Sequence, residues 1–368
     1  MNRSRGSRSL RRSLLLGGIA LICGLTSGSC AVPFDPIGLV NSVRVMSVDV
    51  NTLDLATEDA NDFSGGGSYA RPGDTVRLTM TAYDGRESGG EPLTIVWIAG
   101  CFNPPGNQYY GCYQQLGEVF ASLSGGGPPP AGLIGTGPFF DLTLPADIVS
   151  DVPEPDSGER VGTAYVFFLA CAGTIGPVEQ DGDTSAGSFP IGCFDASGNQ
   201  LGPESFVPGY TQVYAFEDER LNQNPLVLGL SWDGATLEAD AIQEVAACTV
   251  TEEERKMSGC AAVDEFTECT TVKLDIDVPD DVAEADPGAQ DAEGNELREV
   301  VWVSYFASGG EFESETKLIS DARDGIQGDT RTTRWVPPSE PGIYQIWAVA
   351  RDNRGGSTTT THTVTVTD

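Results

Sequence analysis

Short stretches of this chain alternate apolar and polar residues with a period of two. In residues 75–84 (TVRLTMTAYD), Val76, Leu78 and Met80 alternate with polar side chains. Residues 271–280 (TVKLDIDVPD) repeat the pattern with Leu274 and Ile276 in the apolar positions. Successive side chains of a strand point to opposite faces, so each stretch is predicted to be a half-buried β-strand.

The same series of predicted strands occurs twice. A strand precedes each of these two stretches, and a tryptophan-containing strand, a tyrosine-containing strand and a closing strand follow. The first copy comprises 42–50, 75–84, 93–101, 162–172 and 211–218, and the second comprises 225–233, 271–280, 298–306, 342–352 and 361–367. We therefore expect an all-β protein with two β-sandwich domains in tandem, spanning 42–218 and 225–368, joined by a polar linker at 219–224.

Glycine and proline separate the predicted strands. The chain has 45 Gly and 23 Pro in 368 residues. Two turn sequences are alike, DASGNQL at 195–201 and DAEGNEL at 291–297. Gly followed by Asn tolerates positive φ, so both are predicted to be hairpin turns.

The first 29 residues have the pattern of a secretory signal peptide. Five arginines and no acidic residue occur in the first twelve positions, and an apolar run from Leu14 to Leu25 and small residues follow. This run is shorter than the roughly 20 residues that span a bilayer. We expect residues 1–29 to be removed and residues 30–41 to form an N-terminal tether.

Residues 25–30 resemble the lipobox of bacterial lipoproteins, in which small residues directly precede a cysteine. The resemblance implies lipid attachment at Cys30, although the pattern favours Leu where this chain has Ser27. Cleavage after Ser29 or Ala31 without lipid is the alternative. Because Ala31 follows the cysteine, the resemblance favours the outer membrane, with secretion as the alternative. Arg11 and Arg12 also resemble a twin-arginine export signal. We rank this export route second, because the cysteines favour folding after export.

The strand series resembles the immunoglobulin-like and PKD-like domains of bacterial surface proteins. Trp97 and Trp302 match the tryptophan on the third strand of such domains. Tyr344 matches the tyrosine corner, and Tyr165 is its counterpart in the first domain. The chain lacks cysteines within the strands that carry the usual inter-sheet disulfide. The resemblance implies two immunoglobulin-like sandwiches, and it says little about function.

Spaced cysteines in an exported chain predict disulfide-closed loops. We expect Cys101 to pair with Cys112 and Cys171 with Cys193. The other disulfide candidates are Cys248, Cys260 and Cys269, and one of them is left over if Cys30 carries lipid. If Cys30 stays on the chain without lipid, eight cysteines could form four bridges. Close pairs of ligands, as structural zinc sites use, do not occur among these cysteines.

The chain is strongly acidic, and this limits its partners. Without residues 1–29 it has 16 Lys and Arg against 54 Asp and Glu, a formal charge of −38. Such a charge repels nucleic acid. Asp181 and Asp183 are candidates for calcium, but their loop does not match an EF-hand. Calcium is therefore considered only as a possible partner.

Motifs for catalysis are missing from the sequence. There is no G-x-S-x-G, Walker A or H-E-x-x-H pattern. The single histidine, His362, is expected on the surface of the last strand. We therefore expect a non-catalytic protein without a cofactor.

Tyr109, Tyr110 and Tyr113 cluster in the loop between Cys101 and Cys112 or directly after it. Loops on such scaffolds carry binding surfaces, so these residues are the candidates for partner binding, although packing over the core of the first domain is the favoured interpretation. The expected function is that of a non-catalytic cell-envelope lipoprotein, attached to the membrane by its lipid, with a structural or recognition role toward a protein or glycan. An accessory binding module of a secreted hydrolytic system is the alternative, and a calcium-dependent adhesin ranks below it.

Overall fold

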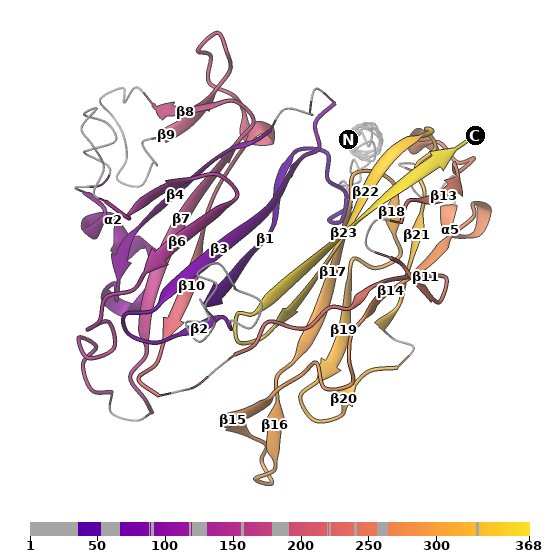
Figure 1. The fold of residues 1–368 in the computed structure, drawn as a ribbon. Helices are drawn as coiled ribbons and strands as arrows, with labels where there is room; N and C mark the ends of the chain where they lie inside the picture. Colours follow the sequence, from indigo (N-terminus) through magenta and orange to yellow (C-terminus); the bar gives the residue numbers. More distant parts are fainter. Residues whose placement is uncertain are drawn as a thin grey trace, which may run out of the picture.

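The protein is all-β and consists of two β-sandwiches that lie next to each other (Figure 1). A computed structural model of the chain describes these residues: 36–52, 67–87, 89, 92–117, 119, 131–155, 158–178, 191–218, 220, 222–238, 241–255, 264–328 and 331–368. Within these ranges no helix is both long and apolar enough to cross a bilayer.

The first sandwich packs a three-stranded sheet, β1-β3-β6, against a five-stranded sheet, β2-β10-β7-β4-β5. Its strands are β1 (Val43–Thr52), β2 (Tyr69–Ala70), β3 (Thr75–Asp84), β4 (Thr94–Phe102), β5 (Ile134–Thr136), β6 (Phe139–Thr143), β7 (Gly162–Cys171) and β10 (Phe206–Ala215). Trp97 is fully buried between the sheets, where its ring lies 6.1 Å from that of Phe140 on β6. The alternation in β3 places Val76, Leu78 and Met80 in this core, as predicted.

The second sandwich packs the sheet β12-β11-β14-β21-β18 against β13-β23-β22-β17-β19-β20. Its strands are β11 (Gly229–Trp232), β12 (Ala235–Thr236), β13 (Gln243–Ala246), β14 (Val272–Asp277), β17 (Val301–Ala307), β18 (Glu311–Phe312), β19 (Thr316–Asp321), β20 (Gly325–Ile326), β21 (Thr333–Val336), β22 (Gly342–Asp352) and β23 (Ser357–Thr367). Leu274, Ile276 and Trp335 lie in its core.

The repeat in the sequence is also a repeat in topology. The order β1-β3-β6 corresponds to β11-β14-β21, and β10-β7-β4-β5 corresponds to β23-β22-β17-β19. Each closing strand also pairs in parallel with a short strand, β10 with β2 and β23 with β13. The sequence did not predict β6 or β21, which pair with β3 and β14.

Two short hairpins and a few helical turns complete the described fold. The hairpins are β8 (Thr174–Pro177) with β9 (Ile191–Phe194) and β15 (Ala285–Gln290) with β16 (Glu296–Arg298). The helical turns are η1 (Pro105–Asn107), η2 (Tyr109–Gly111), α2 (Cys112–Gln115), η3 (Pro203–Ser205), α4 (Glu252–Arg255) and α5 (Glu265–Glu268).

The two similar turn sequences adopt the same conformation. The carboxylate of Asp195 accepts hydrogen bonds from the backbone N–H groups of Ser197 and Asn199, both at 2.8 Å. The carboxylate of Asp291 likewise accepts from the backbone N–H groups of Glu293 and Asn295. The glycines of both turns have φ near +85°. The turn at 291–297 closes the β15–β16 hairpin, whereas the turn at 195–201 follows β9.

Tyr344 forms the tyrosine corner that the sequence predicts, because its hydroxyl donates to the backbone oxygen of Glu340 at 2.9 Å. The prediction for Tyr165 is wrong. Its hydroxyl donates instead to the backbone oxygen of Asn107, 58 residues away, at 2.9 Å. Tyr165 thus holds a long-range loop in place rather than a local corner.

The prediction that Trp302 is the core tryptophan of the second sandwich is also wrong. Val301, Val303 and Tyr305 point into the core, so Trp302 points out of it and is partly exposed. The strand is irregular here, because its register with β19 shifts between Val301 and Trp302. Trp335 on β21 takes the core position, and its indole N–H donates to the oxygen of Gly309 at 3.2 Å.

His362 is buried, contrary to the expectation that it lies on the surface. Its side chain is 3% exposed, and burial lowers its pKa. Its Nε2 lies 3.2 Å from the hydroxyl of Thr360, and it stands next to Ile346 of β22 in the sheet. Its Nδ1 has no hydrogen-bond partner among the described residues, so we assign this histidine to packing.

The sandwiches meet where β1 lies alongside β23 (Figure 1). An apolar cluster fills this contact, with Met46 from the first domain and Trp347 from the second, and the ring of Tyr83 lies 4.8 Å from that of Trp347. The hydroxyl of Ser47 is 2.7 Å from that of Thr359. The contact is therefore a packed interface with polar links.

Residues of the predicted linker and tether take part in this interface. Asn222 is fully buried, and its amide donates to Ser68 at 2.8 Å and to Asp352 at 3.1 Å, one residue from each sandwich. Val40 is buried in the apolar cluster, and Leu39 bridges to Ala307. These contacts fix the arrangement of the two domains.

Candidate functional site

Three disulfides join cysteines of the described ranges, and two of them were predicted. Cys101 is bonded to Cys112 and Cys171 to Cys193, with Cα atoms 5.3 and 5.6 Å apart. The third joins Cys248 to Cys269, a pairing that the sequence had left open. Cys30 and Cys260 lie outside the described residues. Because disulfides persist in oxidising compartments, this is an exported protein.

The Cys101–Cys112 disulfide holds a loop against the outer face of β4 and β7. Cys101, Cys112 and Leu116 are fully buried there, together with Ile98 and Leu169 of the sheet. A second small core thus covers part of this face, which explains why every residue of β7 is buried.

The loop is fixed at several points besides the disulfide. Gln115 exchanges two hydrogen bonds, both of 3.0 Å, with the backbone of Phe102. Tyr165 binds the oxygen of Asn107, which has a φ of +50° directly after Gly106 at +69°. Such a left-handed pair makes a sharp turn, and it sends the next residues back over the sheet.

Tyr109, Tyr110, Tyr113 and Tyr210 form an exposed cluster that we call the tyrosine surface. The ring of Tyr109 stacks on that of Tyr210 at 4.9 Å with an interplanar angle of 20°. Tyr110 and Tyr113 meet Tyr109 edge-on at 5.7 and 6.4 Å. The exposed fractions are 40% for Tyr109, 58% for Tyr110, 40% for Tyr113 and 44% for Tyr210.

The core-packing alternative for these tyrosines therefore fits only in part. Tyr113 contacts Phe167 of β7 at 6.5 Å, and burial raises the pKa of its hydroxyl. The rings nonetheless remain exposed on one side. Exposed aromatic rings on a rigid support lose little entropy on binding, so such a cluster is suited to contact a partner.

Tyr210 also connects this surface to a groove at the domain junction. We define the junction groove by six of its lining residues, Tyr69, Tyr210, Gln212, Tyr214, Trp302 and Arg354. Its volume is about 760 Å³. The first four belong to β2 and β10 of the first sandwich, whereas Trp302 and Arg354 belong to the second. The groove thus exists only when the two domains are docked.

The polar groups of the groove are held in place by their neighbours. The hydroxyl of Tyr214 donates to Gln212 at 2.9 Å. Arg354 donates to Glu284 at 2.7 Å and to Glu299 at 3.0 Å, and its guanidinium lies 6.0 Å from the ring centre of Tyr69. Glu299 is fully buried, and this burial raises its pKa to about 7.

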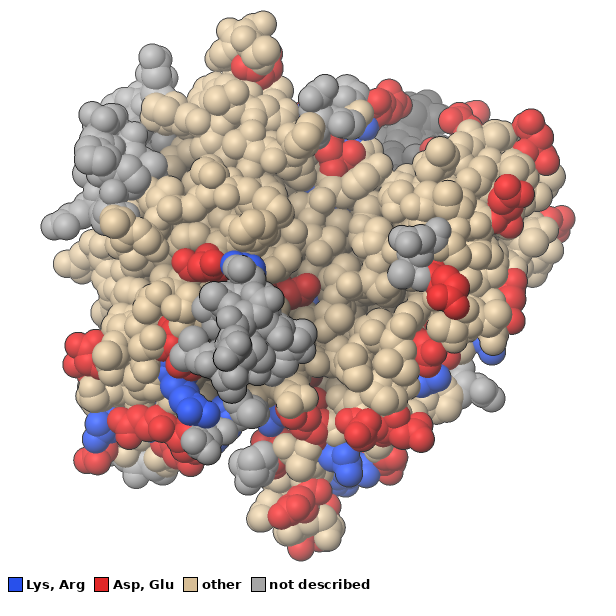
Figure 2. Space-filling model, viewed as in Figure 1, with Lys and Arg blue, Asp and Glu red and all other residues tan. Residues whose placement is uncertain are grey.

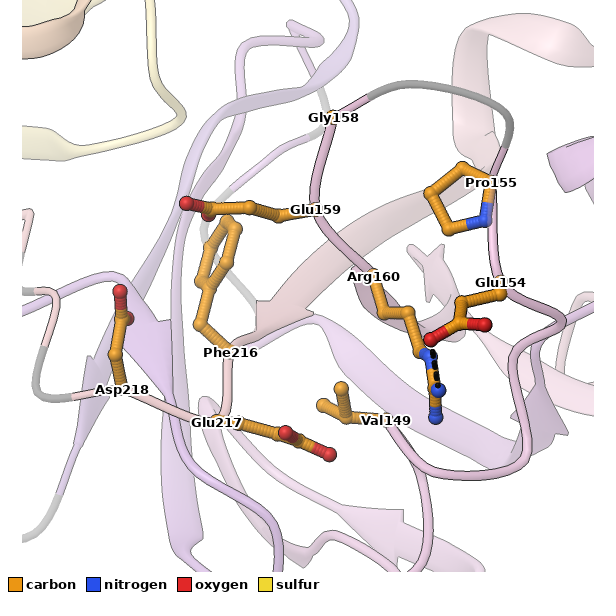
Figure 3. A pocket seen from close by; sticks show the side chains of 9 residues that line it. All are labelled: Val149, Glu154, Pro155, Gly158, Glu159, Arg160, Phe216, Glu217 and Asp218. Atoms are coloured by element: carbon orange, nitrogen blue, oxygen red, sulfur yellow. Dashed lines mark hydrogen bonds and ion pairs between the residues drawn. The ribbon is translucent and has the colours of Figure 1, made fainter.

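An acidic cavity of about 550 Å³ adjoins the groove and shares Phe216 with it (Figure 3). Figure 3 shows Arg160 directed toward Glu154, at 3.1 Å, and Glu159 beside Phe216. Arg220 pairs with Glu159 and lies 4.8 Å above the ring of Phe216. In the described ranges, no three acidic, cysteine or histidine side chains are grouped so that they could hold a metal ion.

Charge is distributed unevenly over the surface. In the face that Figure 2 shows, carboxylates gather with a few basic side chains along the lower edge, around the β15–β16 hairpin and below β2, and further carboxylates lie along the right edge. The area over β3, β4 and β6 in the same view has few charged side chains. The calcium candidates Asp181 and Asp183 lie outside the described residues.

Sequence reasoning found three members of the tyrosine surface and missed the rest of the site. Tyr210 and Tyr214 lie two and six residues after Pro208 on one face of β10, a period-two signal that was readable in residues 206–215. The predicted closing strand began at residue 211 and so excluded Tyr210. Nothing in the sequence indicated that Trp302 would lie across the junction from Tyr214.

No protein-family model matches the chain, and no curated protein matches it. Among solved structures it is similar to the D00-D0 domain of Intimin, with 10% identity, 88% of this chain and 100% of that chain covered, and a TM-score of 0.20. The C-terminal domain of the Streptococcus pyogenes antigen I/II-family protein AspA gives 8% identity, 88% and 100% coverage, and a TM-score of 0.21.

Dimeric latent PorU from Porphyromonas gingivalis gives 10% identity, covers 90% of this chain and 24% of its own, and has a TM-score of 0.19. TM-scores of this size carry no argument. The fold assignment therefore rests on the strand pairing and the tyrosine corner described above.

Proposed function

We propose that this protein is a non-catalytic recognition protein of the bacterial cell envelope, which binds a protein or glycan partner through the tyrosine surface. One observation carries the proposal: the rings of four tyrosines from the disulfide-held segment and β10 contact one another and stay exposed. A monomeric domain without a partner has no need for a rigid aromatic cluster on its outside.

The N-terminal sequence supports an envelope location. A basic and apolar leader ends at a cysteine in lipobox-like surroundings, so lipid on Cys30 would hold the protein at the outer membrane. The disulfides support export. The intact mass of the mature protein from its native host tests the anchor: a chain beginning at Cys30 and carrying diacylglyceryl or triacyl groups supports it, and an unmodified chain contradicts it.

The binding role is tested with fluorescently labelled mature protein and envelopes from the native host lacking the gene. We expect saturable binding that falls at least tenfold in Tyr110→Ala and in Tyr113→Ala, because both remove exposed rings. Phe139→Ala is the matched control, since Phe139 is a 54% exposed aromatic residue on β6 of the other sheet. Equal binding of all four proteins would show that the tyrosine surface is not the binding site.

The same surface would serve an accessory module of a secreted hydrolytic system, the alternative function. The two differ at the N-terminus, because a secreted module carries no lipid. The mass measurement therefore separates them, whichever partner is bound.

A further inference from the structure

We infer that the junction groove binds a neutral oligosaccharide chain. This inference rests on the proposed recognition function, which it deepens by naming the ligand class and a second set of residues. The observations that carry it are the aromatic lining, the state of the polar groups and the distance that the rings span.

Aromatic side chains from both domains line part of the groove. Tyr210, Tyr214 and Tyr69 stand on one side and Trp302 on the other, and all four are partly exposed. The ring of Tyr69 meets that of Tyr214 edge-on at 6.4 Å. Aromatic faces carry negative partial charge and attract the slightly positive C–H groups of a sugar ring, while they pack against its apolar side. Sandwich strands carry these rings, so their positions are set before a ligand arrives.

The polar groups favour a ligand with hydroxyls. Gln212 offers an amide to the groove, and the hydroxyl of Tyr214 lies next to it at 2.9 Å. Such groups can both donate and accept hydrogen bonds, as sugar hydroxyls do. Fixed polar groups beside aromatic rings recur in small-molecule sites.

Two charged residues that line the groove, Asp352 and Arg354, are already paired within the protein. Asp352 lines it, but its carboxylate accepts from Asn222, from the backbone of Arg354 at 2.7 Å and from Gly356 at 2.8 Å. The guanidinium of Arg354 is held by Glu284 and Glu299. These charges are satisfied within the protein, and the excess of carboxylates repels acidic polysaccharides. A neutral chain requires no charge partner.

The spacing of the rings predicts a dependence on chain length. Tyr210 and Tyr214 are four residues apart on β10, which is about 13 Å at the usual rise of a strand. A single sugar ring cannot contact both, whereas a chain of several rings can lie along β10 toward Trp302. Affinity should therefore rise from monosaccharide to tetrasaccharide.

The test uses the full mature chain and tryptophan fluorescence, checked by calorimetry. The probes are the neutral tetrasaccharides of glucose (α- and β-linked), mannose, xylose and N-acetylglucosamine, each with its monosaccharide. Tetragalacturonate and tetralysine represent the charged alternatives. We expect one or more neutral tetrasaccharides to bind at least tenfold more tightly than the corresponding monosaccharide, and neither charged probe to bind.

Variants connect the binding to the groove. Trp302→Ala should weaken binding at least tenfold, which corresponds to about 1.4 kcal/mol. Tyr210→Ala, at an exposed position, should weaken it similarly, whereas Trp302→Phe keeps a ring and should stay within about fivefold of the wild type. Phe139→Ala should leave the affinity unchanged.

Three results would overturn the inference: no neutral tetrasaccharide binds at 10 mM, a charged probe binds in its place, or the Trp302 and Tyr210 variants bind the sugar as the wild type does. The proposed function is judged separately by the envelope assay with Tyr110→Ala and Tyr113→Ala. Loss of sugar binding with intact envelope binding refutes only the inference. If the neutral sugar binds in the groove but Tyr110→Ala and Tyr113→Ala bind envelopes as the wild type does, the inference stands and the proposed role of the tyrosine surface is refuted.

Discussion

Replacing Trp347 by alanine should separate the two domains without damaging either core. Trp347 lies on β22 but points away from the second core, and it is 4% exposed because Met46 and Tyr83 of the first domain cover it. Its strand neighbour Ile346 points into the core instead. The substitution therefore removes apolar contact mainly from the interface.

The size of the effect follows from this location. Truncation of a buried tryptophan costs about 3 to 5 kcal/mol when the cavity cannot collapse. At an interface the domains can instead separate, so the loss cannot exceed the free energy with which they dock. The remaining polar links, such as Ser47 with Thr359 and Ser357 with Asp49, contribute about 1 kcal/mol each. We expect docking to weaken by about 3 kcal/mol.

Differential scanning calorimetry measures the consequence. The wild type should unfold in one transition, because docking couples the domains. Trp347→Ala should show two transitions, the first lowered by about 6 to 12 °C, since 1 kcal/mol corresponds to about 2 to 4 °C for domains of this size. Ile343→Ala is the control on the same strand, at a 74% exposed position. A single transition within 2 °C of the wild type would refute the reasoning.

Three further predictions concern pH, the disulfide-held loop and the tyrosine corner. Burial raises the pKa of Glu299 from 4.5 to about 7, so the folded state retains a proton that the unfolded state releases. Stability should thus fall as pH rises from about 4.5 to 7, and urea unfolding of Glu299→Gln should show a shallower decline; an unchanged slope would contradict this. Replacing Cys101 and Cys112 by serine opens a loop with a sequence separation of 11 residues and should cost about 3 kcal/mol in urea unfolding under oxidising conditions. Under reducing conditions the difference from the wild type should disappear, and its persistence would point to packing instead. Tyr344→Phe removes the hydrogen bond to Glu340 and should cost about 1 kcal/mol, whereas equal stability would show that the corner is held by packing alone.

Much of the architecture was readable in the sequence because it depends on local patterns. The alternation in residues 75–84 and 271–280 marks a buried face with a period of two, which is what a half-buried strand requires. The bracketing of a short loop by Cys101 and Cys112 predicted a bond that forms between neighbouring parts of the chain. The tyrosine corner of Tyr344 was also predictable, since donor and acceptor are four residues apart.

The candidate site was only partly readable, because it is assembled from distant segments. Trp302 appeared to match Trp97, but a strand of alternating apolar residues does not reveal which face turns inward at an irregular register. Tyr165 seemed to be a second tyrosine corner, yet its hydroxyl binds a loop 58 residues away. Tyr210 was not connected with Tyr109, since only the pairing of β10 with β7 brings them together.

The sequence alone thus determined the all-β class, the two similar sandwiches and two disulfide-closed loops. These properties follow from periodicity, turn residues and the spacing of cysteines, which act over short distances along the chain. Tertiary structure decided which aromatic residues are buried, how Asn222 and Trp347 dock the domains, and which side chains meet at the junction groove. Those outcomes depend on contacts between residues far apart in sequence, where pairing register and domain packing select one arrangement among many.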